Sequence, residues 1–107
     1  MLFRSPFGDT LTLWHPPKDG WFEMAPGILV GRPFDPVSDV VPAELPAGRA
    51  GHFLLLGPYD GLPGAWQLLF AWCAEQKLGL AGTNWEIYRE PTVDPATFET
   101  ALYALLV

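Results

Sequence analysis

The segment between residues 45 and 90 constrains the fold most, because it places a helical pattern between two extended ones. The apolar run 52–56 ends at the sequence Gly-Pro-Tyr-Asp-Gly at 57–61, and clustered glycine and proline are typical of a tight turn. Residues 63–77 then show apolar side chains at helical spacing, and residues 85–90 alternate apolar and polar side chains as a strand does. The segment therefore predicts one strand–turn–helix–strand unit, which the rest of the chain completes.

The predicted helix, 63–77, has recognisable ends and little polar surface. Pro63 lies in its first turn, where the missing N–H costs nothing, and Gly79 is placed as the residue that follows the last turn. Steps of 100° put four apolar side chains on one stripe: Trp66, Leu69, Phe70 and Cys73. A helix this apolar is expected to be covered on more than one side, by the aromatic N-terminal segment or by a second copy of the chain. This favours a homodimer.

The predicted strand 85–90 has two chemically different faces. Trp85 and Ile87 point one way, and Glu86 and Tyr88 the other. Because a helix needs an apolar surface to pack on, we expect Trp85 and Ile87 to face it and Glu86 and Tyr88 to lie on the opposite face. Further along, Asp94-Pro95 is typical of the start of a single helical turn, and residues 100–107 form an apolar strand suited to the interior of a sheet.

The first 46 residues predict short extended elements separated by proline turns. A hairpin across residues 10–24 with its turn at 15–20 is the simplest interpretation, and the Pro-Gly pair at 26 and 27 is expected to end it. Residues 27–32 predict another strand, and 38–44 an edge strand that tolerates Pro42. At 107 residues, the chain is expected to form one domain, 1–107, of the α+β class: an antiparallel sheet with one main helix on one face.

Charge and residue counts exclude several classes of function. The chain has 12 Asp+Glu against 6 Lys+Arg, and direct binding to nucleic acid is not expected because phosphates require a basic face. The acidity favours cationic ligands or serves solubility. Cys73 is the single cysteine and is expected to be buried. His15 and His52 lack spaced carboxylates, so neither a metal site nor a cofactor is expected.

Targeting signals are not visible in the sequence. The N-terminal residues lack a basic region followed by an apolar run, and no window approaches the roughly 20 apolar residues that span a bilayer. The expectation is a cytoplasmic protein with no membrane contact.

A set of short motifs between residues 45 and 107 resembles a known family. The motifs are Leu45-Pro46-Ala47-Gly48-Arg49-Ala50, Gly57-Pro58-Tyr59, Ala65-Trp66, Trp72, Glu86-Ile87-Tyr88 and Asp94-Pro95. In order and spacing they resemble the GyrI-like family, also called the AraC-type effector-binding domain. Residues 27–36 resemble it more weakly. The resemblance implies two strand–helix–strand–strand repeats that pair into one antiparallel sheet, with helices on one side and a concave cleft on the other. The family's cleft binds lipophilic molecules, often aromatic or cationic.

The chain departs from that family in its first half. The helix of the first repeat has no counterpart before Gly27. Either a hairpin with Trp14 and Trp21 replaces that helix, or a partner chain completes the cleft. No helix-turn-helix segment is visible, so a role in transcription would be exercised through another protein.

Glu86 is the principal candidate site residue, because the resemblance implies a cleft glutamate at this position. Tyr88 lies two residues on, where it could bind a ligand or act with Glu86 in acid–base catalysis. Trp14, Trp21 and His52 complete the candidate ligand-binding set. For each residue the alternative is structural: a solvated carboxylate, a sheet-face tyrosine, or core tryptophans.

Three functions follow from these observations. The first is a domain that binds lipophilic, aromatic and in some members cationic small molecules, with Glu86 as counter-charge. The second is a small hydrolase of cyclopropane-containing alkylating natural products that uses Glu86 and Tyr88. The third is an acidic protein-interaction module of the gyrase-modulator type.

Overall fold

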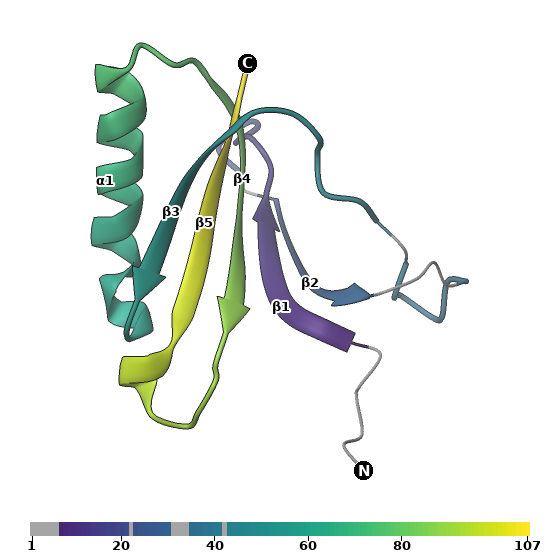
Figure 1. Ribbon diagram of the computed structural model, residues 1–107. Helices are drawn as coiled ribbons and strands as arrows, with labels where there is room; N and C mark the ends of the chain where they lie inside the picture. The colour runs from purple at the N-terminus through teal and green to yellow at the C-terminus, as the bar shows by residue number, and fades with distance from the viewer. Residues whose placement is uncertain (1–6, 22, 31–34, 42) are drawn as a thin grey trace.

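The computed structural model describes residues 7–21, 23–30, 35–41 and 43–107. Its elements are β1 (Phe7–Trp14), β2 (Met24–Val30), β3 (Ala50–Leu56), the 3-10 helix η1 (Tyr59–Gly61), α1 (Leu62–Glu75), β4 (Leu80–Arg89), the 3-10 helix η2 (Pro95–Thr97) and β5 (Glu99–Leu106). The strands form one antiparallel sheet in the order β2-β1-β4-β5-β3, and α1 lies along one face (Figure 1). The predicted α+β architecture, an antiparallel sheet with one main helix on one face, is confirmed.

The hydrophobic core lies between α1 and the β3–β5 part of the sheet. Ala65, Leu69 and Cys73 of α1 are buried against Leu102 and Ala104 of β5. Each large side chain buried in this way stabilises the fold by roughly 1.5–3 kcal/mol. The helix can approach closely because β3 has Gly51 beneath it, where a Cβ would lie 2.9 Å from the sulfur of Cys73.

The C-terminal strand occupies the interior of the sheet, as its apolar sequence predicts. β5 pairs with β4 on one side and with β3 on the other. The turn before it also follows the prediction, because the Asp94 side chain accepts a hydrogen bond from the Ala96 N–H at the start of η2.

The N-terminal hairpin is longer than predicted, because β2 does not end at the Pro-Gly pair. Pro26 lies opposite Thr12 in the ladder with β1. The bond from His15 N–H to the carbonyl of Glu23 fixes the alternation of the ladder, so the nitrogen of Pro26 points away from β1. β2 is an edge strand, and a proline nitrogen turned to the free edge costs no hydrogen bond.

The predicted edge strand at 38–44 is wrong where it can be checked. Val37 and Val40 form an isolated bridge around a turn in which Ser38 has φ +55°. A left-handed residue interrupts an extended strand. Pro42, and residues 31–32 of the predicted strand 27–32, lie outside the described residues.

The end of α1 also differs from the prediction. Lys77, with φ +56°, takes the left-handed position after the last turn, and Leu78 N–H donates to the carbonyl of Cys73 at 2.9 Å. This is the bond that closes a Schellman-type end, so Gly79 is not the capping residue.

None of the helices in the described residues is long and apolar enough to cross a membrane.

Candidate functional site

Glu86 and Tyr88 lie on the face of the sheet that α1 covers. Glu86 is the ladder partner of the core residue Leu102, and Trp66 of α1 donates a hydrogen bond to it. The prediction that Trp85 and Ile87 face the helix is therefore wrong. Trp85 lies on the opposite face, where it is 6 % exposed and stacks on Tyr103 with ring centroids 5.3 Å apart. Neighbouring side chains of the sheet bury it without a helix.

A groove opens on the helix side, between α1 and the strands β1 and β4. Its volume is about 390 Å³. Three strand residues and four helix residues line it: Trp14 from β1, Asn84 and Glu86 from β4, and Leu62, Pro63, Trp66 and Phe70 from α1. We call it the glutamate groove, because Glu86 is the ionisable residue among its described lining residues.

Glu86 is buried and accepts two side-chain hydrogen bonds. The residue is 4 % exposed. The indole Nε1–H of Trp66 donates to Oε2 at 2.5 Å, and the hydroxyl of Tyr88 donates to Oε1 at 2.7 Å. Both neighbours thus supply donors, the complement that a carboxylate requires.

Thr12 extends this network from the neighbouring strand. It lies directly opposite Glu86 in the β1–β4 ladder and is 8 % exposed. Its hydroxyl is 2.8 Å from the hydroxyl of Tyr88. Tyr88 has one hydroxyl proton, which goes to the acceptor-only carboxylate, so Thr12 donates to the oxygen of Tyr88. The resulting order of donation is Thr12 to Tyr88 to Glu86.

The environment keeps the Tyr88 hydroxyl protonated. Burial raises the pKa of Tyr88 from 10.0 to about 12, and its hydrogen bond to Glu86 adds to the increase, while the bond with Thr12 acts in the opposite direction. Tyr88 is therefore a neutral donor at physiological pH.

Aromatic rings surround the carboxylate, and no cationic side chain of the described residues pairs with it. Trp66 makes an edge contact with Trp14 at a centroid distance of 6.5 Å and stacks on Phe70 at 5.3 Å. Within the described ranges the recorded ion pair is Arg89–Glu99, with 3.7 Å between nitrogen and oxygen, at the surface. Burying a carboxylate without a counter-charge is costly. A cation placed beside the carboxylate would reduce that cost.

A second tyrosine–carboxylate pair lies next to the first. The Tyr59 hydroxyl donates to Glu90, and the Tyr59 ring lies 5.7 Å from that of Tyr88 and 5.1 Å from that of Phe98. Burial, followed by the bond to Glu90, raises the pKa of Tyr59 to about 12. Tyr59 is half-buried and Glu90 is exposed, and neither lines the glutamate groove.

The structure brings together three of the five candidate site residues. Glu86 and Trp14 line the glutamate groove, and Tyr88 bonds to Glu86. Trp21 is 78 % exposed in the turn between β1 and β2 and joins no site. His52 lies on the face opposite α1, where its ring stacks on Tyr103 at 4.6 Å and its Nδ1 is 3.1 Å from the carbonyl of Leu102.

Trp66, Thr12 and Asn84 belong to the site but were not predicted for it. Helical phase assigned Trp66 to packing. A signal was present, since Leu62, Trp66 and Phe70 follow one another at intervals of four residues, which marks one side of a helix. The buried stripe of α1 is the neighbouring one, so this side remains free to line a groove. Thr12 and Asn84 have no local signal, because their role depends on strand pairing.

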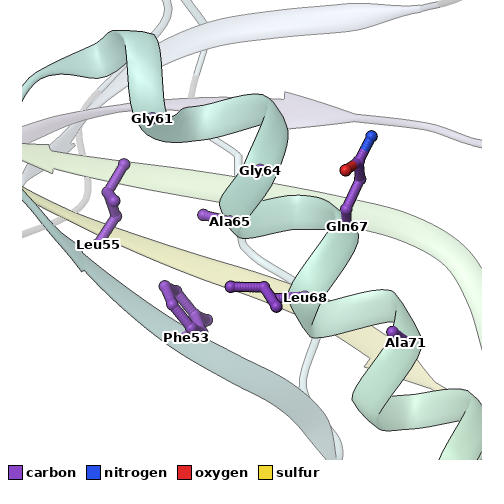
Figure 2. A pocket seen from close by; sticks show the side chains of 8 residues that line it. All are labelled: Phe53, Leu55, Gly61, Gly64, Ala65, Gln67, Leu68 and Ala71. Atoms are coloured by element: carbon purple, nitrogen blue, oxygen red, sulfur yellow. The ribbon is translucent and has the colours of Figure 1, made fainter.

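A second groove, of about 630 Å³, lies on the other side of α1, above β3 (Figure 2). We call it the edge groove. Its lining is Phe53, Leu55, Gly61, Gly64, Ala65, Gln67, Leu68 and Ala71. Although it is larger, the polar side chain among its described lining residues is Gln67, which points away from the strand in Figure 2. Nothing in this lining could carry acid–base chemistry. Within the described part of the chain, no group of three or more His, Cys, Asp or Glu side chains could hold a metal ion.

No protein-family model matches the chain, and no curated protein is significantly similar to it. The function of the chain therefore has to be inferred from the glutamate groove.

Proposed function

We propose that the glutamate groove binds a lipophilic, aromatic small molecule that carries a positive charge. The observation that carries the proposal is the buried carboxylate of Glu86, which accepts bonds from Trp66 and Tyr88 and has no cationic partner among the described residues. A cationic ligand would supply the missing counter-charge to a carboxylate that is 4 % exposed, where attraction between charges is stronger than in bulk water.

The lining supports the aromatic and lipophilic part of the proposal. Trp14, Trp66 and Phe70 offer ring faces and edges around the carboxylate. A cation near such rings gains roughly 0.5–2 kcal/mol from each well-placed contact. The volume of about 390 Å³ is at the small end of the usual range for ligand pockets, which favours a flat molecule with few rings.

Within this proposal the chain is a GyrI-like effector-binding domain with a reduced first half. Support comes from the motifs between residues 45 and 107 and from an antiparallel sheet with one main helix on one face. The β1–β2 hairpin replaces the helix of the first repeat and contributes Trp14 to the groove. The family resemblance implied a cleft on the face away from the helix, and in this protein the proposed site is instead the groove beside α1.

The test is a titration with one cationic and one neutral aromatic dye of similar size, in which tryptophan fluorescence monitors binding. Glu86→Gln should weaken binding of the cation by about 1–3 kcal/mol, the scale of one charged hydrogen-bonding partner, or roughly 5- to 140-fold in Kd. Binding of the neutral dye should change little. Glu90→Gln is the matched control, because Glu90 also accepts a tyrosine hydroxyl but lies outside the groove.

The Glu86→Gln protein should retain its fold. The amide oxygen can accept from Trp66, and the amide NH₂ can donate to Tyr88, whose hydroxyl then turns to Thr12. A loss of cation binding would therefore reflect the lost charge. Equal affinity of wild type and Glu86→Gln for the cationic dye would refute the proposal.

A hydrolase is the second candidate, and the 2.7 Å contact between the Tyr88 hydroxyl and Glu86 favours it. Glu86 would take a proton from a water whose oxygen bonds to a strained cyclopropane carbon of an alkylating natural product. One ring C–C bond breaks in this step, and its electron pair passes into a conjugated carbonyl of the same molecule, whose oxygen takes up a proton. The protonated Tyr88 would donate a hydrogen bond to the carboxylate and so position it. In this scheme Glu86→Gln leaves substrate binding largely intact and abolishes turnover, which separates it from the binding function.

A further inference from the structure

The outer edge of β3 presents a row of backbone groups that no strand in the described part of the chain pairs with. β3 is the last strand of the sheet and pairs with β5 alone. Two bonds flank this ladder: Leu106 N–H to the carbonyl of Arg49, and Gly57 N–H to the carbonyl of Phe98. They make the odd-numbered residues of β3 the ones that bond to β5. The N–H and C=O groups of Ala50, His52, Leu54 and Leu56 therefore point outward.

This edge lacks the features that keep sheet edges apart. The seven-residue strand Ala-Gly-His-Phe-Leu-Leu-Leu has no Lys, Arg, Asp, Glu or Pro, and its pairing with β5 has no bulge. Leu54 and Leu56 are exposed. A long, neutral, apolar edge is a template for pairing with another strand.

The edge groove continues this surface onto the helix. Figure 2 shows Phe53 and Leu55 rising from β3 toward α1, and Leu68 reaching from α1 toward Phe53. Leu68 and Trp72 of α1 are exposed large apolar side chains. The unpaired edge and the uncovered apolar groove are therefore one continuous surface.

We propose that this surface joins two copies of the chain, through antiparallel pairing of β3 with β3 of the second copy. Outward-pointing residues must pair with outward-pointing residues, which restricts the register. One register uses all seven residues: it places Ala50 opposite Leu56 of the other copy and His52 opposite Leu54. The two-fold axis then passes through Phe53, and the two Phe53 side chains meet beneath the edge grooves.

Charge argues for a second copy over a partner of different chemistry. The chain has a net charge of −6, yet β3 and the described lining of the edge groove contain no Asp, Glu, Lys or Arg. Two copies can therefore meet here without direct repulsion, and an antiparallel strand pair has the two-fold symmetry that homodimers require. A charged peptide finds no complement at this edge.

The dimer has one ten-stranded sheet with both helices on the same face. The glutamate groove lies on the other side of α1, formed with β1 and β4, and stays open. The proposed dimer can thus be refuted without affecting the proposed ligand site, and the ligand site without affecting the dimer.

Light scattering after size-exclusion chromatography tests the pairing. The wild type at tens of micromolar should have twice the 11.8 kDa mass of one chain. Leu54→Pro removes one outward N–H and no bond to β5, and it should shift the mass to that of one chain. Ile28→Pro is the matched control, since its N–H points to the free edge of β2 by the alternation set at Glu23. Leu54→Lys, which places a charge at the same edge, should act as Leu54→Pro does.

A cysteine scan tests the register. In a non-hydrogen-bonded pair the Cα atoms are about 4.5 Å apart, within disulfide range. Phe53→Cys should therefore cross-link two chains on mild oxidation. Leu54→Cys should not, because Leu54 lies opposite His52 of the second copy, two residues from the second copy's Leu54. A monomeric wild type, or dissociation by Ile28→Pro with no effect at Leu54, would overturn the proposal. Cross-linking at Leu54 in place of Phe53 would overturn the register.

Discussion

Removing the hydroxyl of Tyr88 should destabilise the protein far more than removing the hydroxyl of Tyr59. Tyr88→Phe keeps the ring but leaves Oε1 of Glu86 without its donor and the hydroxyl of Thr12 without its acceptor. Glu86 is 4 % exposed and Thr12 8 %, so water cannot readily replace either bond. A hydrogen bond to a charged group contributes about 1.5–3 kcal/mol and a neutral one about 0.5–1.5 kcal/mol. The free energy of unfolding should therefore fall by about 2–4 kcal/mol.

Tyr59→Phe provides a matched comparison, because Tyr59 also donates to a glutamate, but this acceptor, Glu90, is exposed. Water can take over that bond, and the loss should stay below about 1 kcal/mol. Urea unfolding, monitored by tryptophan fluorescence, measures the free energy of unfolding of both variants. Equal losses for the two tyrosines would refute the reasoning that burial makes the Glu86 network valuable.

Two further predictions concern pH and packing. The folded state raises the pKa of Tyr88 and Tyr59 from 10.0 to about 12, so it holds these protons more tightly than the unfolded chain does. Their contribution to stability should be complete below pH 10.0 and lost as the pH rises toward about 12. The loss should be smaller in Tyr88→Phe. Urea unfolding at a series of pH values measures the free energy of unfolding, and a value independent of pH over that window would contradict the prediction. Gly51→Ala should cost about 1–3 kcal/mol, because its Cβ would lie 2.9 Å from Sγ of Cys73, and combination with Cys73→Ala should cost less than the sum of the two single changes in the same assay.

Local sequence patterns were sufficient to predict the strand–turn–helix–strand unit and the end of the chain. Two of the signals act through neighbours in the chain, namely the proline at the start of α1 and the Asp94 cap. The apolar run of β5 acts through burial alone. The alternation along β4 also predicted correctly that Glu86 and Tyr88 share a face. It could not decide which face, because Trp85 on one face of β4 and Glu86 on the other are both buried.

The site itself depends on contacts that local patterns do not contain. Glu86 can face the helix because Trp66 of α1 donates a hydrogen bond to it, and because Thr12 of β1 bonds to its neighbour Tyr88. A pattern of apolar and polar residues treats any carboxylate as an outward residue, since it does not include such distant donors. Similarly, Pro26 ends a strand only if its nitrogen must bond, which depends on the order of strands in the sheet.

The hairpin formed by β1 and β2 has a consequence for how the groove responds to a ligand. Of the side chains described in these two strands, Thr12 is the buried one, and the hairpin joins the rest of the sheet through the β1–β4 ladder alone. A unit with so little buried surface opens at a lower free energy than the core does. Trp14 thus lies on a unit that opens more easily than the core does. A ligand that contacts both Trp14 and Trp66 would also link the folding of the hairpin to that of the helix. Occupancy of the groove would then appear as slower hydrogen exchange in β1 and β2.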